Sequence, residues 1–421
     1  MNAFDLSPEA ARRALASTGA LADGDDDDAV ADRYARIVWS HLTEPGDGTA
    51  GRLVAELGPA SALRAMMQST PPSLQSLTPA DFSAGRRRWM PRLSPDAATS
   101  SLRTAALTGV TIVTPADPHW PDQLGDLEEH APLCLWVRGE AARLSELSSS
   151  AALVGARAAT SYGEHVAMEL AADLAGGGTP IVSGGAYGID GAAHRAALAV
   201  GGLTVAFLAG GADRAYPAGH AQLIGRIADH GVVVSEVPCG STPTKWRFLQ
   251  RNRLIAALTA ATVVVEAGWR SGAINTAGHA AALSRGLGAV PGPVTSAASA
   301  GTHRLLREFG AQCITSATDV RELLAEFGAH CITSATDVRE LLGMIDDRRL
   351  PFPRAEGGDR PFTDDCTRVR DALSTRVWRE ADDLARRCGM AVEEVESLLG
   401  LLQLAGEVAR EAGAWRRIGA S

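Results

Sequence analysis

The chain has 421 residues, of which 46% are hydrophobic and 21% are charged, and its formal net charge is −9. This composition indicates a globular protein of two or three domains and excludes a disordered chain. No apolar run is long enough to span a membrane. The acidic balance excludes a surface that is basic throughout, but it does not exclude a local basic groove.

The cysteines are scattered, and no two of them have the CxxC spacing of a zinc or redox site. They are Cys134, Cys239, Cys313, Cys331, Cys366 and Cys388. The N-terminus lacks the charged-then-apolar order of a signal peptide. Together these features predict reduced thiols, no metal site and a cytoplasmic protein.

The first part of the chain divides into two predicted segments. Residues 1–28 end in an acidic run, GDDDD, and are expected to be a flexible leader. Residues 29–105 repeat apolar residues at helical spacing, which predicts a small helical domain of the SAM or helix-hairpin-helix type. Within it, PGDGTAGRLVAELGPASAL (45–63) fits a helix-turn-helix that contacts a nucleic-acid backbone, but two short packed helices are the simpler interpretation.

Residues 106–345 form the predicted core. Short apolar runs, such as AALVGAR and ATVVVEAG, alternate with helical patterns at roughly 162–176, 190–200, 219–230, 248–260 and 272–285. Continuous apolar strands separated by helices are typical of a mostly parallel sheet covered on both faces. We therefore expect an α/β, Rossmann-like, doubly wound fold. Ligands of such folds bind outside the carboxyl ends of the strands.

The end of the core contains a repeated segment. Residues 308–324 return at 326–342 with a single difference, Gln312 against His330. Two copies are too few for a solenoid, and we interpret them as an in-frame duplication. Only one copy can fill one strand-and-helix position unless the sheet gains a strand.

A small C-terminal domain is predicted after a linker at residues 346–362. Three helical patterns and a hairpin over residues 363–421 indicate a winged-helix-like domain. Its predicted recognition helix is acidic, with Glu393, Glu394 and Glu396. A helical cap or a partner-docking module fits this region equally well.

A glycine cluster opens a helix in the core, in VSGGAYGIDGAAHRAAL (182–198). A bare backbone and free helix-start N–H groups suit a phosphate. A dinucleotide is not expected, because Arg157 stands at the second glycine of the G-x-G-x-x-G pattern and no carboxylate follows the second strand. P-loop ATP hydrolysis is not expected either, since the sole lysine, Lys245, does not follow these glycines.

The predicted anion site combines two strand ends. Arg157 would place permanent positive charge beside the helix start, with a structural ion pair as the alternative. Close backbone approach comes from Ser183, Gly184, Gly185 and Gly188. Asp190 is expected to be the N-cap of the following helix, and His194 fits a packing role at least as well as a ligand-binding one.

A basic and aromatic segment follows, KWRFLQRNR (245–253). Its charges are Lys245, Arg247, Arg251 and Arg253, with Trp246 and Phe248 between them. Basic side chains that follow phosphates, next to aromatic rings that stack on bases, suit single-stranded nucleic acid. An amphipathic helix start with solvated arginines is an equally good interpretation. Ser271, Gly272 and Asn275 open the next helix and form a second candidate anion site.

A nucleotide-processing hydrolase is the alternative function. Glu266 is a candidate catalytic carboxylate, with Glu236 as its partner. Carboxylates at strand ends often hold neighbouring N–H groups or arginines instead, and nothing else in the chain suggests a catalytic pair.

Seven segments in register over residues 108–310 make the chain similar to the DNA processing protein A (DprA/Smf) family. They include VGARAATSYG, IVSGGAYGIDGAAHRAAL, VVSEVPCGSTPTKWRFLQRNRLIAAL and VVVEAGWRSGAINTA. The resemblance implies a protein without enzymatic activity or cofactor that binds single-stranded DNA, forms homodimers and loads RecA recombinase in natural transformation. The DNA-binding positions that it implies are Arg157, Ser183, Gly184, Gly185, Gly188, Lys245, Phe248, Arg251, Asn252, Arg253, Ser271, Gly272 and Asn275.

The chain departs from the family at three places. Tyr187 stands where many relatives have a basic residue, so stacking on a base is expected to replace a phosphate contact there. Leu249 replaces a common proline. The repeated segment is not a family feature, and it bears on dimerisation and on the RecA contact more than on DNA binding.

Overall fold

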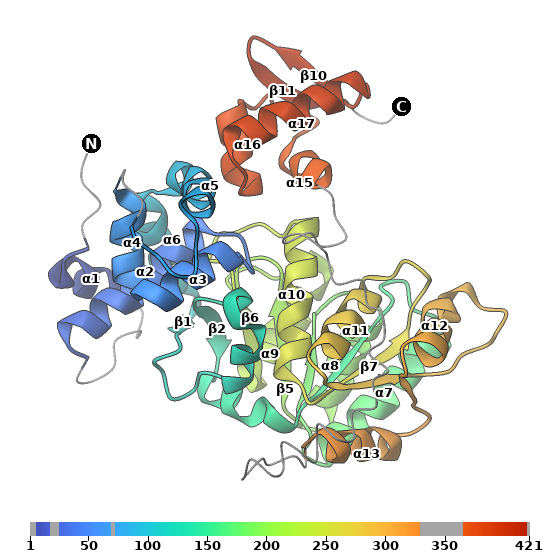
Figure 1. The fold of residues 1–421 in the computed structure, drawn as a ribbon. Helices are drawn as coiled ribbons and strands as arrows, with labels where there is room; N and C mark the ends of the chain where they lie inside the picture. The colour runs from blue at the N-terminus through green and yellow to red at the C-terminus, as the bar shows by residue number, and fades with distance from the viewer. Residues whose placement is uncertain (1–5, 17–24, 69–71, 329–364, 419–421) are drawn as a thin grey trace.

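The computed structural model describes residues 6–16, 25–68, 72–328 and 365–418. A helical N-terminal unit, an α/β core and a small C-terminal domain follow one another along the chain (Figure 1). The predicted linker and the second copy of the repeat after Gly328 lie outside the described residues. No helix in the described ranges is both long and apolar enough to cross a membrane.

The N-terminal unit is built of short helices. They are α1 (Pro8–Leu15), α2 (Asp27–Leu42), α3 (Gly48–Leu57), α4 (Pro59–Met67), α5 (Pro79–Trp89), the 3-10 helix η1 (Met90–Arg92) and α6 (Pro95–Thr108). Residues 45–63 supply α3 and the first part of α4, and their Leu53 and Leu63 are fully buried in the core of this unit. The rings of Trp39 and Trp89 meet edge-on, with 5.1 Å between their centroids.

The expectation of a flexible leader is wrong for residues 8–15. They form α1, which buries Ala11 and Leu15 completely, because apolar residues at i and i+4 share one face of a helix. The acidic run also has a local role. The Asp26 side chain accepts a hydrogen bond from the backbone nitrogen of Ala29 at 2.8 Å and caps α2.

A nine-stranded sheet forms the centre of the core, in the order β1-β2-β6-β5-β4-β3-β7-β8-β9. The strands are β1 (Val110–Val113), β2 (Leu135–Gly139), β3 (Ala151–Gly155), β4 (Ile181–Ser183), β5 (Thr204–Leu208), β6 (Val232–Ser235), β7 (Ala261–Glu266), β8 (Gly286–Ala289) and β9 (Gln312–Cys313). All neighbours from β6 to β9 are parallel, and β2 pairs antiparallel with β1 and β6. The predicted Rossmann-like, mostly parallel sheet is confirmed.

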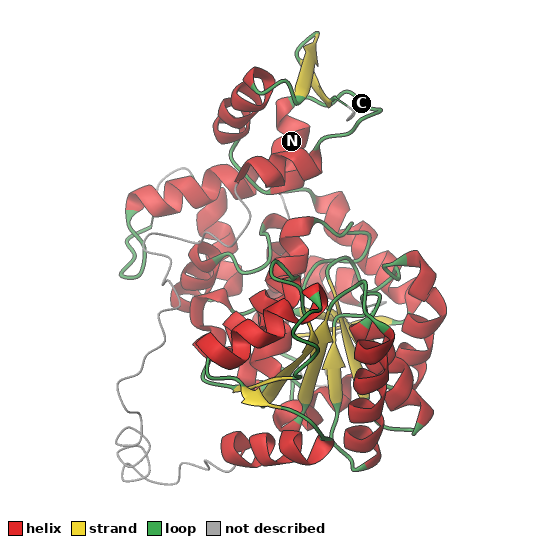
Figure 2. Cartoon of the chain, turned by 90° about the vertical axis from the view of Figure 1, so that its right-hand side faces the viewer, coloured by secondary structure: helices red, strands yellow, loops and turns green. Residues whose placement is uncertain are grey.

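Helices cover both faces of this sheet (Figure 2). They are α7 (Ser161–Gly176), α8 (Ile189–Ala199), α9 (Ala221–His230), α10 (Lys245–Leu258), α11 (Gly272–Ala282), α12 (Ala300–Glu308) and α13 (Ala317–Gly328), with short 3-10 segments between them. Side chains of β5 alternate between the faces: Ala206 and Leu208 pack with α9, and Val205 and Phe207 pack with α10. Both faces are therefore buried, which explains the continuous apolar runs.

The strand order reverses beside β3, since β4, β5 and β6 lie on one side of it and β7, β8 and β9 on the other. The loops after β3, β4 and β7 leave the same edge of the sheet, because these strands are parallel. The crevice at such a reversal is where doubly wound folds bind ligands. At the far edge of the sheet, the first copy of the repeat provides β9 and most of α13, whose last residues, 326–328, begin the second copy.

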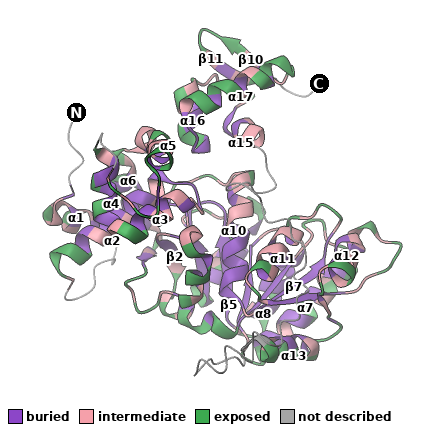
Figure 3. Cartoon of the chain, in the orientation of Figure 1, coloured by how far each residue is buried: buried purple, intermediate pink, exposed green. Residues whose placement is uncertain are grey.

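The C-terminal domain is a winged helix, as the three helices and the hairpin predicted. It consists of α15 (Asp365–Ala372), α16 (Ala381–Cys388), α17 (Val392–Leu404), β10 (Val408–Glu411) and β11 (Ala414–Arg417). The domain has its own core, which includes Leu384, Val395, Leu399 and Trp415. Buried stretches of α16 and α17 are visible in Figure 3. Its first helix, α15, contacts α10 of the central domain.

Candidate nucleic-acid interface

The turn between β4 and α8 requires its glycines. Gly185 and Gly188 have φ angles of +66° and +73°, in the region that side chains rarely adopt. A Cβ atom on Gly184 would clash with the guanidinium of Arg251. The turn therefore brings bare backbone to the carboxyl edge of the sheet, as the sequence predicted.

Asp190 is not the N-cap of α8, which is Gly188. Asp190 lies in the first turn of the helix, and its carboxylate turns back to accept hydrogen bonds from the nitrogens of Gly184 and Ala186 at 3.1 and 3.4 Å. Burial raises the pKa of this carboxyl, although the charge of Arg251 opposes the rise. Within the described residues, the nitrogens of Gly185, Tyr187 and Gly188 donate to no protein acceptor, so this turn offers open donors to an anion.

A buried cation lies beneath this turn. Arg251 donates hydrogen bonds to the carbonyl oxygens of Gly184 and Phe207 at 2.7 and 2.6 Å. Burial lowers its pKa to about 10, which leaves the guanidinium charged at neutral pH. Arg251 thus both holds the turn in place and adds positive charge below it.

The two candidate anion sites are joined by amide side chains. Arg251 donates to the Asn252 side-chain oxygen at 3.1 Å, and the Asn252 side-chain nitrogen donates to the Asn275 side-chain oxygen at 3.1 Å and to the Gly272 carbonyl at 3.3 Å. Ser271 caps α11 by accepting from the Ala273 nitrogen. The starts of α8 and α11 are therefore linked through one side of α10.

Aromatic rings and an exposed arginine lie at the mouth of the site. The guanidinium of Arg157, in the loop after β3, is 4.6 Å from the centre of the Phe248 ring. The ring of Tyr216 lies 5.6 Å from the same ring. Tyr187 is 47% exposed and packs edge-on against His220 at 4.7 Å. Planar groups thus line the entrance next to the open backbone donors.

Tyr216 is not among the residues that the sequence predicted for this site. It follows β5 in GGADRAYP, a third polar loop at the same edge of the sheet. The order of the strands would have shown its position, because β5 lies next to β4.

Lys245 is the first residue of α10, and its side chain is exposed. It lies three residues before Phe248, so the two side chains share one face of the helix. Within the described residues, neither Lys245 nor Arg157 forms an ion pair with a carboxylate. Both charges are therefore available to a phosphate.

The structure does not bring all the predicted residues together. Arg253 is buried on the opposite side of α10, where it donates to both carboxylate oxygens of Glu236 at 2.6 Å and to the His130 carbonyl. The buried Ser183 hydroxyl donates to the Leu153 carbonyl at 2.6 Å, so only the backbone of Ser183 belongs to the turn.

His194 has the packing role. Its ring nitrogen Nδ1 lies 2.7 Å from the Thr204 hydroxyl inside the core. Burial lowers its pKa to about 3, so the ring is neutral.

The two candidate catalytic carboxylates lie far apart, and each already has hydrogen-bond partners in the protein. Glu266 accepts hydrogen bonds from the nitrogen and the hydroxyl of Thr160, the cap of α7, while Glu236 binds Arg253. Because β5, β4 and β3 lie between their strands, a spacing of about 4.8 Å per strand puts the strand ends roughly 19 Å apart. Carboxylate pairs of glycosidases lie within about 10 Å of each other.

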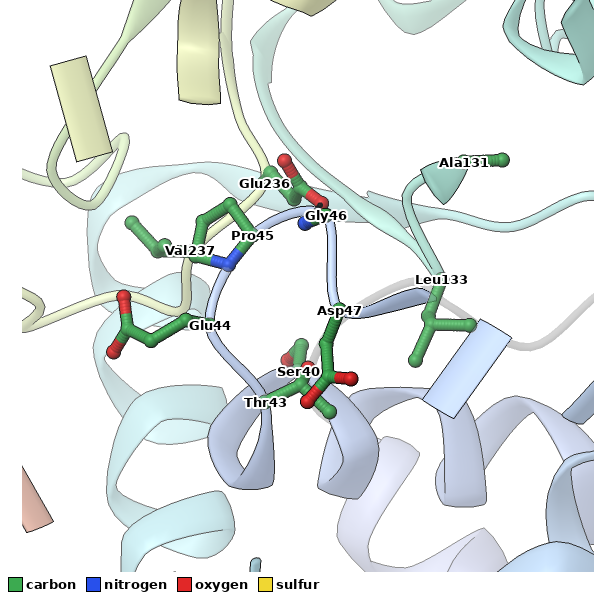
Figure 4. A pocket seen from close by; sticks show the side chains of 10 residues that line it. All are labelled: Ser40, Thr43, Glu44, Pro45, Gly46, Asp47, Ala131, Leu133, Glu236 and Val237. Carbon is green, nitrogen blue, oxygen red and sulfur yellow. Dashed lines mark hydrogen bonds between the residues drawn. The ribbon is translucent and has the colours of Figure 1, made fainter. Parts of the chain in front are cut away.

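A small cavity lies elsewhere, beside the loop between α2 and α3 (Figure 4). Glu236 lines it, and the Glu236 carboxylate accepts from the nitrogen of Gly46 at 3.4 Å. None of the predicted DNA-binding residues lines this cavity. Among the described side chains, no three histidines, cysteines or acidic residues form a metal-binding group.

Comparisons with known proteins show the family of this chain. Residues 111–325 match the model of the DNA recombination-mediator protein A family, and residues 353–414 match the DprA winged helix domain. A putative DNA processing protein DprA from Mycobacterium tuberculosis is 45% identical over 332 residues, which cover 76% of this chain and 80% of the relative.

Two solved structures are also similar. DNA processing protein A from Streptococcus pneumoniae has a TM-score of 0.54 and 28% identity, covering 70% of this chain and 97% of its own. The structure of DNA processing protein A from Helicobacter pylori, which concerns the single-stranded DNA binding mode of that protein, has a TM-score of 0.46 and 30% identity. It covers 51% of the present chain and 97% of its own. The chain belongs to the DNA recombination-mediator protein A family, with a role in DNA processing or recombination.

Proposed function

We propose that this chain binds single-stranded DNA at the carboxyl edge of its sheet and mediates recombination without catalysing a reaction. The observation that carries the proposal is the exposed Arg157 guanidinium over the Phe248 ring, beside a turn with open backbone donors. Phosphates suit the donors and the free cations, and unpaired bases suit the rings. Bases within a duplex are stacked on each other and do not expose their faces. Single strands are therefore the favoured ligand.

Binding should depend little on sequence and fall steeply with salt, because backbone amides and cations contact phosphates rather than base edges. We expect Arg157→Ala and Lys245→Ala each to weaken binding to labelled oligo-dT roughly tenfold or more. Each substitution should also reduce by about one the slope of the logarithm of the binding constant against the logarithm of the salt concentration. Arg226→Ala removes an exposed charge on α9 and is the matched control. Unchanged affinity in both site variants, or a preference for duplex, would refute the proposal.

The single lysine allows an independent footprint. An amine-reactive acylating reagent can modify only Lys245 and the N-terminal amine, because the chain has no other lysine. We expect oligo-dT to protect Lys245 while the N-terminal amine reacts as before, measured by peptide mass spectrometry. Equal reaction of Lys245 with and without saturating DNA would place the bound strand elsewhere.

The absence of catalysis is part of the proposal, and its rival is a nucleotide-processing hydrolase. The contacts of Glu266 with Thr160 support a capping role for that carboxylate. Purified protein incubated with nucleotides should release no product. Product release that disappears in Glu266→Ala would establish the hydrolase instead.

The proposal extends to the partners that the family resemblance implies: RecA recombinase, a second copy of the chain, and incoming DNA of natural transformation in the cytoplasm. A mediator should shorten the lag of RecA filament growth on DNA coated with single-strand-binding protein. Arg157→Ala should lose this effect while sedimenting as the same oligomer as the wild type. An unchanged lag with the wild-type protein would remove RecA loading from the proposal.

A further inference from the structure

The winged-helix domain reaches the proposed DNA site at the first residue of α10. The carboxylate of Asp371, in the last turn of α15, accepts a hydrogen bond from the backbone nitrogen of Lys245 at 3.0 Å. The next residue of α10 is Trp246, and the centre of its ring lies 4.4 Å from the guanidinium of Arg368 in α15. The two helices lie next to each other in Figure 1.

This contact lies at the end of α10 that serves the proposed site. Lys245 carries the free charge, and Phe248 stands one turn further along the same face. The first N–H groups of a helix point out of its end and bear partial positive charge, so they attract anions. A carboxylate and a DNA phosphate present equivalent oxygen acceptors to the Lys245 nitrogen. Only one of them can accept that hydrogen bond at a time.

Other contacts hold α15 in this place. Arg368 donates to the Cys388 carbonyl at 2.7 Å and so connects α15 to the end of α16. The next residue, Gly389, lies against the buried side chain of Glu44 in the N-terminal unit. The Asp371 contact itself is exposed to solvent. Exposed polar contacts contribute little stability, so an anionic ligand can replace this one at low cost.

We propose that Asp371 occupies a phosphate position at the start of α10, so that the winged-helix domain competes with single-stranded DNA for the site. DNA that extends to Lys245 then displaces α15 from α10. The inference rests on the proposed DNA site and adds its regulation. It gives the C-terminal domain a role that requires no DNA contact of its own.

The direct test is Asp371→Asn in the full-length chain. The amide has the same shape but no charge, so we expect binding to oligo-dT to tighten by about three- to tenfold as the competing anion is lost. Asp382→Asn removes an equally exposed charge from α16 and should leave the affinity unchanged. An Asp371→Asn affinity equal to that of the wild type would overturn the inference. Equal tightening in both variants would also overturn it, because the effect would then be one of net charge.

These outcomes are distinct from failure of the DNA site. If the wild type binds oligo-dT through Lys245 but Asp371→Asn has no effect, only the competition is wrong. If neither the wild type nor Asp371→Asn binds oligo-dT, the proposed function itself fails.

Hydrogen exchange provides a second readout on the unmodified protein. Saturating oligo-dT should slow exchange in residues 182–190 and speed it in residues 365–372, because DNA covers the turn and releases α15. Slower exchange in the turn with no change in α15 would show that DNA binds without displacing the domain.

Discussion

Arginine supplies nearly all the positive charge of this chain, and the neighbours of each arginine decide what that charge can do. Arg157 is exposed over a phenylalanine ring and has no carboxylate partner in the described residues. Arg251 is buried and holds the glycine turn through carbonyl oxygens. Arg253 is bound to Glu236. Three arginines within reach of one helix therefore have three different surroundings.

Tyr187 gives a prediction at this scale. Its exposed ring stands on the turn itself, so Tyr187→Phe should keep the affinity for oligo-dT, whereas Tyr187→Ala should lose about 1–3 kcal/mol of binding. Fluorescence anisotropy measures both. Val200→Ala, an exposed apolar change just after the other end of α8, is the control. Wild-type affinity in Tyr187→Ala would show that this ring does not stack on a base.

At the scale of the element, α10 separates two environments. One face presents Lys245, Phe248 and Asn252 to the carboxyl edge of the sheet. The other binds the N-terminal unit and nearby loops through Arg247, which pairs with Glu44, and through Arg253. The basic run KWRFLQRNR is thus shared between a proposed ligand site and structural ion pairs.

The two faces predict opposite effects of charge removal. Arg253→Ala should cost up to about 3–5 kcal/mol of unfolding free energy, because Arg253 is buried and its loss leaves the Glu236 carboxylate, which is only 12% exposed, without its arginine partner. Lys245→Ala should change stability by less than about 0.5 kcal/mol, since it is exposed and unpaired in the described structure. Urea unfolding measures both changes in stability. DNA affinity, measured without urea and well below the unfolding temperature, separates an effect on binding from one on stability. A stable Arg253→Ala that loses DNA binding would place Arg253 in the interface.

The sequence predicted the position of α10 more accurately than the contacts that its charged side chains make. The periodicity predicted a helix at roughly 248–260, and the structure begins it at Lys245, where the Thr244 hydroxyl accepts from the Arg247 nitrogen at 3.2 Å. Polar residues on both faces hide the helical period in the first turn. Which charges meet carboxylates depends on Glu44, 203 residues earlier in the chain, and no local pattern contains that information.

At the scale of the whole molecule, Glu44 connects the three parts. It accepts hydrogen bonds from Arg247 of the core and from Arg92 of the N-terminal unit at 2.6–2.9 Å, and Gly389 of the C-terminal domain lies against it. Burial alone would raise the pKa of this carboxyl, but the two arginines outweigh burial and lower it to about 2. The domains are thus joined by a charge that stays ionised except in strong acid.

Three histidines with lowered pKa values predict the pH dependence of stability. Burial lowers the pKa of His41 and His279 to about 4 and that of His194 to about 3. Unfolded histidines titrate near 6.5, so between pH 6.5 and 4 the unfolded state binds more protons and stability falls as the pH falls. At pH 5.5 each should cost about 1 kcal/mol. Urea midpoints measure this, and His194→Gln should reduce the slope. Constant stability from pH 7.5 to 5.5 would contradict the neutral, buried state.

The sequence by itself determined the family, the alternation of strands and helices, and the glycine turn, because apolar runs and glycine spacing are local properties of the chain. Only the tertiary structure decided that α1 packs against α2, that Asp190 turns back to the turn before it, and that Tyr216 joins Phe248. The contact between Asp371 and Lys245 joins residues 126 positions apart. Such contacts follow from strand order and domain packing, and these set which charges are satisfied and which are left for a ligand.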